Sequence, residues 1–387
     1  MIKRHGLSKK GEFFQKAWIV SVFKNMLFNR GGKMRGGGFL LPLLLILLSG
    51  CYKHFEFDTT PLNLPEVSLL LFSPASGYIG VYDCLKDSVI GEDEIAIRRD
   101  GKLESARDFE VVNKKVYVTI DWLQAFEKTS NIMRVLNLTT GNIEEVTCIY
   151  DPVHFCKINE NHLFILTHLK SSEDGLFHNA IYNVLNEEVE EIVKTENEIL
   201  FAVNYGDSVI LCESQIVDTT AKFYLSLYSI KNKIFLGKID LCGIIRDIPY
   251  IGIVKGNFFY IVSSHHVYKF SVEDMSFITS AELSEYSSFP YNVIAVDDKL
   301  YISFMEGEKL DVVDLVAFQL EKVISISKGD ITTLTYSKRL NRIYGASIDT
   351  SRLYIINPDG EVVEREIMLN CSVCQGIQRI KILEEEE

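Results

Sequence analysis

Residues 291–326, YNVIAVDDKLYISFMEGEKLDVVDLVAFQLEKVISI, contain four short apolar segments separated by three polar turns. The segments are rich in Val, Ile and aromatic residues, which favour β-strands. In the second segment Leu300, Ile302 and Phe304 alternate with other residues and therefore share one face of a strand. A four-stranded sheet with apolar residues on both faces cannot bury them alone, so we expect similar sheets on either side.

The same pattern recurs along the chain at the spacing of β-propeller blades. Second strands align on an apolar residue followed by an aromatic or aliphatic one, at Val116-Tyr117, Leu163-Phe164, Val209-Ile210, Phe259-Tyr260, Leu300-Tyr301 and Ile343-Tyr344. The steps are 47, 46, 50, 41 and 43 residues, and propeller blades repeat every 40 to 50 residues or so. A polar turn after each third strand, such as Asn357-Pro358-Asp359-Gly360, keeps the same phase.

We therefore predict an all-β fold, a β-propeller over residues 66–383 with seven four-stranded blades, six or eight being the alternatives. Residues 66–105 would form a divergent first blade. The alternating segment Gly376 to Leu383 is expected to join this N-terminal blade, because a ring must close without leaving an open sheet edge. Residues 384–387 would be an acidic tail.

The N-terminal region reads as a secretory leader. Met34-Arg35 is followed by ten apolar residues, 39–48, and then by small residues, which is the pattern of a signal peptide over 34–50. The alternative, a transmembrane anchor, needs about 20 apolar residues. We predict that translation starts at Met34, that residues 1–33 are a spurious or untranslated extension, and that 51–65 are a tether.

Leu48-Ser49-Gly50-Cys51 resembles the lipobox of bacterial lipoproteins. The resemblance implies cleavage after Gly50, lipid transfer to the Cys51 thiol and firm attachment to a membrane. Tyr52-Lys53 contains no inner-membrane retention aspartate, which favours the outer membrane, facing either the periplasm or the cell surface.

The charge balance argues against nucleic acid as a partner. Residues 1–50 hold nine of the 40 Lys and Arg residues and one of the 53 Asp and Glu residues, so the rest of the chain has a net charge of −21. A nucleic-acid binder needs basic surface to neutralise phosphates.

A binding face is suggested by the spacing between the second and third strands. Counted from the second residue of each second-strand pair, such as Tyr117, to the polar residue that ends the third strand, such as Asn137, this spacing is 20, 19 and 19 residues in the second to fourth blades. In the next three blades it is 11, 13 and 13 residues. Extra residues in neighbouring blades would build a raised rim on one face of the ring, and such insertions often mark the binding face.

Five residues of these longer segments are candidate contacts for a ligand or partner: Trp122, Phe126, His168, Phe177 and His178. The alternatives are local core packing for Trp122 and Phe126, and solvated loop histidines for the others. His265 and His266 are adjacent in a hairpin, so we expect them to point to opposite faces.

No motif for a nucleophile elbow, a metalloprotease, a P-loop or a dinucleotide site is present, and the catalytic residues, if any, stay unknown. We expect no metal and no cofactor. Of the seven cysteines besides Cys51, most lie in apolar strands as small hydrophobes, and Cys371 and Cys374 are structural or form a local disulfide.

Second strands such as Leu300-Tyr301-Ile302-Ser303 and turns such as Asn357 to Gly360 resemble bacterial outer-membrane β-propeller lipoproteins with YVTN or quinoprotein-like repeats, including Bacteroidota families of unknown function. The function we infer is a monomeric, non-catalytic binding or scaffolding lipoprotein that holds a glycan, peptide or envelope protein. The alternatives are a hydrolase or lyase of the lactonase-like or glycan-cleaving kind, with acids converging at the ring mouth, and a purely structural envelope protein.

Overall fold

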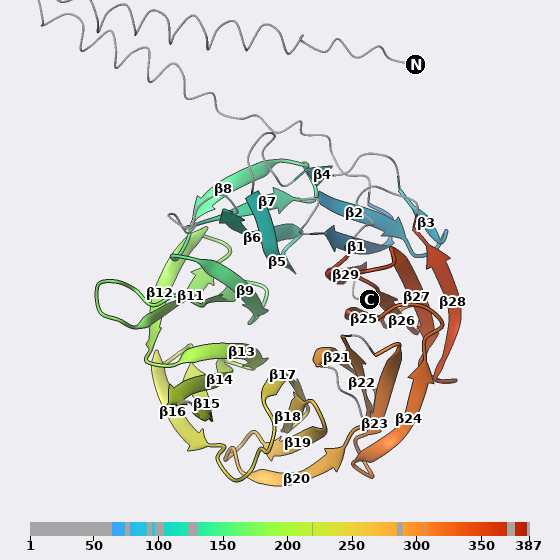
Figure 1. The fold of residues 1–387 in the computed structure, drawn as a ribbon. Helices are drawn as coiled ribbons and strands as arrows, with labels where there is room; N and C mark the ends of the chain where they lie inside the picture. Colours follow the sequence, from blue (N-terminus) through green and yellow to red (C-terminus); the bar gives the residue numbers. More distant parts are fainter. Residues whose placement is uncertain are drawn as a thin grey trace, which may run out of the picture. The chain divides into compact units, whose positions relative to one another are not determined.

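The computed structural model describes residues 64–73, 78–90, 95–96, 104–122, 131–218, 220–284, 289–305, 307–369 and 376–384, all within one compact unit, Phe57–Glu387. These residues form 29 strands and no helix. The strands make seven antiparallel sheets arranged as a ring, which confirms the predicted seven-bladed propeller (Figure 1).

Six blades follow the same order, with the first strand of each innermost and the fourth outermost. The second and third blades are β5 (Glu104–Val112), β6 (Lys115–Trp122), β7 (Ile132–Asn137) and β8 (Ile143–Thr147), then β9 (Pro152–Lys157), β10 (His162–Thr167), β11 (Phe177–Asn183) and β12 (Glu188–Thr195). The fourth and fifth are β13 (Glu198–Tyr205), β14 (Ser208–Val217), β15 (Thr220–Ser229) and β16 (Ile234–Asp240), then β17 (Pro249–Lys255), β18 (Phe258–Ser263), β19 (His266–Ser271) and β20 (Phe277–Glu282). The sixth and seventh are β21 (Pro290–Val296), β22 (Lys299–Phe304), β23 (Lys309–Asp314) and β24 (Gln319–Ser325), then β25 (Thr333–Ser337), β26 (Arg342–Ala346), β27 (Arg352–Asn357) and β28 (Val362–Met368).

The first blade closes the ring with strands from both ends of the chain. Its order is β29 (Arg379–Glu384), β1 (Val67–Ser73), β2 (Tyr78–Asp83) and β3 (Ser88–Val89), and β4 (Ile95–Ala96) also pairs with β2. β1 and β29 are antiparallel, with Leu71 opposite Ile380 and Val67 opposite Glu384. The prediction that the C-terminal strand joins the N-terminal blade is thus confirmed, and β29 takes the innermost position.

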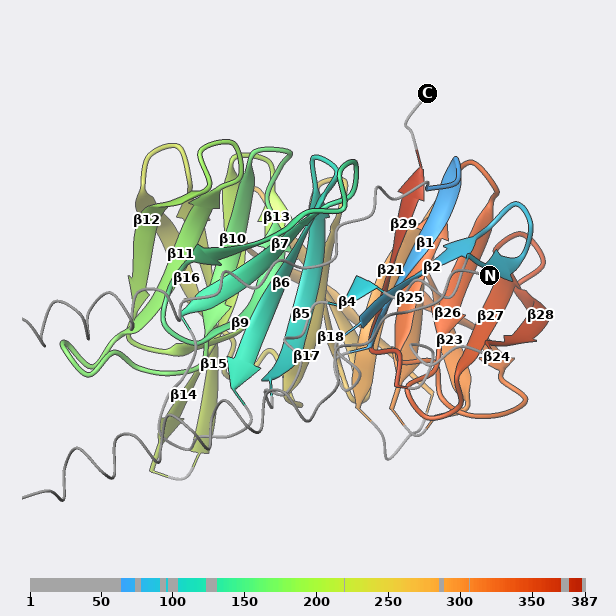
Figure 2. The ribbon, with the colours of Figure 1, turned by 90° about the horizontal axis from the view of Figure 1, so that it is seen from above.

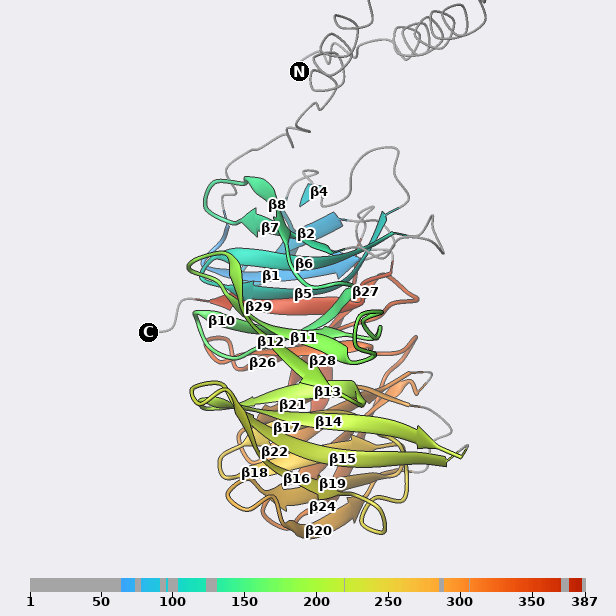
Figure 3. The ribbon, with the colours of Figure 1, turned by 90° about the vertical axis from the view of Figure 1, so that its left-hand side faces the viewer.

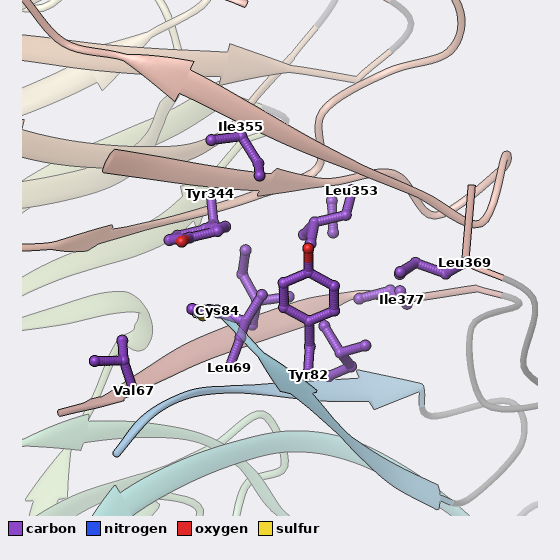
Figure 4. Packing of buried hydrophobic residues seen from close by; sticks show 12 residues of the cluster. Val67, Leu69, Tyr82, Cys84, Tyr344, Leu353, Ile355, Leu369 and Ile377 are labelled. Atoms are coloured by element: carbon purple, nitrogen blue, oxygen red, sulfur yellow. The ribbon is translucent and has the colours of Figure 1, made fainter. Parts of the chain in front are cut away.

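The apolar core is divided among the interfaces between neighbouring blades. Figure 4 shows the interface between the seventh and first blades, where Tyr82 and Leu69 pack against Tyr344 and Leu353. Successive residues of a second strand serve two interfaces: Leu300 packs toward the fifth blade and Tyr301 toward the seventh. This double burial explains why an apolar pair marks each second strand, because a propeller blade is covered on both faces.

The recurring polar turn has a side-chain cause. In the turn between β23 and β24, the Asp314 carboxylate accepts the backbone N–H groups of Val316 at 2.7 Å and Ala317 at 2.6 Å. Asn183 and Asn357 accept equivalent N–H groups in the third and seventh blades. Asn and Asp favour turns because their short side chains can bond the backbone in this way.

The ring has two faces, which we name by their connections. The hairpin face carries the links between second and third strands and those from one blade to the next. The turn face carries the turns between first and second strands and those between third and fourth strands. The end of β29 and the tip of the β14–β15 hairpin lie on opposite faces (Figures 2 and 3). Since Val67 pairs with Glu384 at the end of β29, the chain enters the ring at the turn face.

The prediction that most cysteines are small buried hydrophobic residues agrees with the structure in part. Cys84, Cys156 and Cys212 are buried free thiols and Cys148 is half-buried, whereas Cys242 is exposed. Cys51, Cys371 and Cys374 lie outside the described residues, as do the predicted leader and tether up to residue 63. In the described part of the chain, no helix has the length and apolar character needed to cross a bilayer.

Candidate functional site

The hairpin-face ends of the seven innermost strands surround the ring axis (Figure 1), and we call this region the mouth. Side chains from four consecutive blades meet along one side of it. We name them the polar arc: Arg379 on β29, Asp108 on β5, His154 on β9, His168 after β10 and Glu198 on β13. Arg379 and Glu198 begin their strands and His168 follows the end of β10, whereas Asp108 and His154 lie within β5 and β9.

Asp108 is the best-satisfied member of the polar arc. Its carboxylate lies 3.3 Å from the Arg379 Nε and 3.3 Å from the His154 Nδ1, and it accepts the Phe155 N–H at 3.1 Å. Burial would raise the pKa of Asp108, but Arg379, His154 and the Phe155 N–H outweigh burial and lower it from 3.8 to about 2. Asp108 is therefore a fixed anion that holds three blades together at the mouth.

His168 connects this group to the fourth blade. Its ring meets that of His154 edge-on, with 5.7 Å between centroids. Its Nδ1 lies 2.8 Å from the Glu198 Oε1, but the two atoms do not meet hydrogen-bond geometry, so the contact is electrostatic. Burial lowers the pKa of His168; Glu198 opposes this shift, and His154 and Arg107 add to it. The side chain is 33% exposed and so within reach of a ligand.

Apolar residues occupy the mouth at the fifth and sixth blades. Ile248 precedes β17 and is 49% exposed, and Phe289 precedes β21 and is 51% exposed. The Phe289 ring lies 5.2 Å from that of Tyr250, at an interplanar angle of 47°. We name Ile248, Tyr250 and Phe289 the aromatic arc. The mouth therefore has a charged group on the first four blades and exposed apolar side chains on the fifth and sixth, where Asp247 directly precedes Ile248.

Reasoning from the sequence missed the aromatic arc, although a pattern marks it. Ile248-Pro249-Tyr250 and Phe289-Pro290-Tyr291 stand at equivalent places in adjacent blades. Proline suits the first position of a strand and keeps the residue before it extended. In both blades the preceding apolar side chain stays exposed at the mouth while the proline is buried.

The structure separates the residues predicted from the sequence. Trp122 is the last residue of β6, opposite Glu104, rather than part of a loop. The side chain of Trp122 and the whole of Phe126 lie outside what the structure describes.

Of the three candidates in the third blade, only His168 reaches the mouth. Phe177 begins β11 and is 7% exposed, with the Lys170 ammonium 5.2 Å from its ring centroid. His178 lies further out on β11, with its Nε2 2.9 Å from Asp174, which also pairs with Lys194. Binding roles for these residues stay predictions.

The predicted rim takes two forms. In the third blade the extra residues 168–176 form a connection between β10 and β11. In the fourth blade they lengthen β14 and β15 to ten residues each, with pairing continuous to Val217 and Thr220. Figure 3 shows this hairpin projecting from the ring. Residues 123–130 of the second blade lie outside the described residues.

His265 and His266 do not point apart as expected. The Nδ1 atoms of His265 and His266 lie 3.5 and 3.0 Å from the two oxygens of Asp247. His265 belongs to the turn between β18 and β19, where the alternation of a strand does not apply. Burial would raise the pKa of Asp247, but the two histidines and Ser263 lower it. In the described part of the chain, no three or more His, Cys, Asp and Glu side chains are placed to hold a metal ion.

No protein-family model and no curated protein matches the chain. Solved structures match its fold. Dihydro-heme d1 dehydrogenase NirN in complex with DHE aligns with a TM-score of 0.55 and 9% identity over 81% of this chain and 65% of that one. AztD from Citrobacter koseri aligns with a TM-score of 0.56 and 11% identity over 83% and 99% of the two chains. The chain thus spans just under two thirds of NirN, and at these identities the likeness is one of fold.

Proposed function

We propose that the protein is a non-catalytic binding propeller, attached to the bacterial outer membrane through a lipidated Cys51, whose mouth holds a glycan. The observation that carries the proposal is the pairing of the polar arc with the aromatic arc on one face of the ring. Small-ligand sites combine apolar and aromatic walls with a few fixed polar groups, and the mouth has this composition.

The chemistry of the two arcs favours a neutral oligosaccharide. The Asp108 carboxylate is already paired with Arg379 and contacts His154, so this part of the polar arc needs no charge from a bound ligand. The remaining donors and acceptors of the polar arc suit hydroxyl groups. Tyr250 and Phe289 offer aromatic surface to the apolar face of a sugar ring.

The glycan-cleaving hydrolase alternative usually requires a carboxyl group that can donate a proton near neutral pH. Such groups have a raised pKa. Among the described carboxyl groups with a resolved shift, the pKa is lowered in every case, including Asp108 at the mouth. Asp108 is therefore better suited to holding a ligand than to protonating one.

The proposal is tested with the double variant Tyr250→Ala/Phe289→Ala. Loss of two stacking rings should weaken binding to arrayed neutral oligosaccharides of glucose, mannose, galactose and N-acetylglucosamine about tenfold or more. Phe277→Ala, which removes an exposed aromatic ring from the outer strand β20, should leave binding unchanged.

Binding is measured by array fluorescence and then by calorimetry on the best sugar. A parent protein that binds none of these sugars, or a double variant that binds as well as the parent, contradicts the proposal. Capture of an envelope peptide in place of a sugar would support the protein-binding alternative.

A further inference from the structure

Two histidines of the polar arc face each other at the mouth. His154 lies within β9 and His168 follows β10, and their rings meet edge-on with 5.7 Å between centroids. The His154 Nδ1 is 3.3 Å from Asp108 of the second blade. The His168 Nδ1 is 2.8 Å from Glu198 of the fourth blade. We name His154 and His168 the histidine pair, which thus lies between two acids from different blades.

The two histidines differ in how they contact their acids. The contact between His154 and Asp108 has hydrogen-bond geometry, and Asp108 is held by Arg379 as well. The His168 Nδ1 is enclosed by protein, but within the described residues it makes no hydrogen bond. A buried polar atom without a partner is unfavourable, so His168 gains if a change of protonation or orientation supplies one.

Charged groups from several chain segments act on His168. Burial has the largest effect and lowers its pKa below the ordinary value of 6.5. Glu198 on β13 opposes this shift, whereas His154 on β9 adds to it. Arg107 on β5 also lowers the pKa and Asp151, just before β9, raises it, and these two side chains lie 3.8 Å apart. His168 is therefore neutral at neutral pH, although it lies beside an acid.

A proton on His168 changes its relation to Glu198. An imidazolium donates through both nitrogens, and the acceptor beside Nδ1 is the Glu198 carboxylate. A charge-assisted hydrogen bond then replaces the present contact and satisfies the buried nitrogen. A further proton on His154 would place two positive charges at the ring separation of the pair, so the pair takes up protons in separate steps.

We propose that the histidine pair is a proton-operated switch for ligand binding at the mouth. With His168 neutral, the Glu198 carboxylate, which is 39% exposed, can accept hydrogen bonds from the hydroxyl groups of a ligand. With His168 protonated, the imidazolium holds that carboxylate and the ligand loses the acceptor. This inference rests on the proposed glycan function and adds that acid releases the glycan.

The direction of the pH effect follows from linkage. A ligand that uses Glu198 binds the form in which His168 is neutral, so its affinity is constant above the pKa of His168 and falls as the pH drops through it. By reciprocity, a bound ligand lowers the pKa of His168 further. Because this pKa lies below 6.5 in the free protein, affinity is lost only below about pH 6.5.

Calorimetry on the best sugar of the array tests the switch. Between about pH 7.5 and pH 5 the parent should lose affinity about threefold or more, whereas His168→Gln, whose side chain does not titrate, should bind equally at both. His162→Gln is the matched control and should keep the pH dependence of the parent. His162 begins β10 at the end away from the mouth and lies 3.0 Å from Glu190.

A parent whose affinity does not change with pH overturns the proposal, as does His168→Gln losing affinity in acid like the parent. Proton NMR of the histidine rings tests the switch without a sugar, with the signal of His168 identified by its loss in His168→Gln. His154→Gln should raise the pKa of His168 and Glu198→Gln should lower it, since these neighbours act in opposite directions.

A pKa of 6.5 or above for His168, or one that neither variant moves, also overturns the proposal. A parent that binds no sugar at any pH contradicts the glycan function instead. Opposite pKa shifts in the two variants would then still support a proton switch acting on another ligand of the mouth.

Discussion

Asp108 links three blades through one carboxylate, and its side chain is 7% exposed. Its pKa is held near 2, below the 3.8 of a free aspartate. A carboxyl group whose pKa is lower in the folded protein than in the unfolded chain stabilises the folded state. This stabilisation is complete at pH values above the unfolded pKa, and it is lost as the pH falls to the folded pKa. The contacts of Asp108 therefore add about 2 kcal/mol above pH 4 or so, and this stability is lost between roughly pH 4 and pH 2.

Asp108→Asn should remove this pH-dependent part. Urea unfolding of the parent should show stability falling between pH 4 and pH 2 more steeply than in the variant, with the largest difference above pH 4. Asp274→Asn is the control: the pKa of Asp274 is also lowered to about 2, by Ser276 and Ser271, but in a solvent-exposed turn that joins no blades, where screening leaves little stability to lose. This variant should therefore keep the pH dependence of the parent. Parallel stability curves for the parent and Asp108→Asn would contradict the assignment.

At the level of single residues, the sequence identified one residue of the mouth but did not predict which other side chains lie beside it. His168 was a candidate because of its long connection, and it lies in the polar arc. Arg379 and Asp108 are far apart in the chain and meet only because β29 stands beside β5 after closure. The aromatic arc was missed for the same reason, since its two proline motifs become neighbours only in the ring.

Among the elements, the turn between β23 and β24 depends on one carboxylate. Asp314→Ala leaves the N–H groups of Val316 and Ala317 without their acceptor, so the free energy of unfolding should fall by about 1 kcal/mol. Asp314→Asn keeps an oxygen in that position and should recover most of the loss. Thermal unfolding of both variants measures the difference, and an alanine variant as stable as the parent would show that the turn needs no side-chain acceptor.

The strands were easier to predict than their lengths. Second strands were recognised because both of their faces are buried, which makes a continuous apolar run. The extra residues of the fourth blade looked like a loop from spacing alone. The structure shows a hairpin, because Val209 to Val217 can pair residue by residue with Thr220 to Tyr228.

For the whole molecule, stability depends on closure by β29. Removing residues 376–384 would leave β1 as an unpaired inner edge and open the apolar interface that contains Ile377 and Ile380. We expect the truncated chain to lose its cooperative thermal transition and to aggregate, because every blade relies on a neighbour at each face.

The matched control is a chain that lacks only residues 385–387, beyond the end of β29, which should unfold like the parent. Calorimetry and size-exclusion chromatography measure both. A monomeric, cooperatively folded protein without β29 would show that the ring is stable when open.

The sequence by itself determined the kind of fold and the strand that closes the ring, and it favoured seven blades over six or eight, because blade strands and their turns are specified by local patterns that recur in phase. It also predicted a lipid anchor, which stays a prediction. Only the tertiary structure decided which residues share the mouth. Its polar arc and aromatic arc join side chains from different blades, and their meeting depends on the ring being closed.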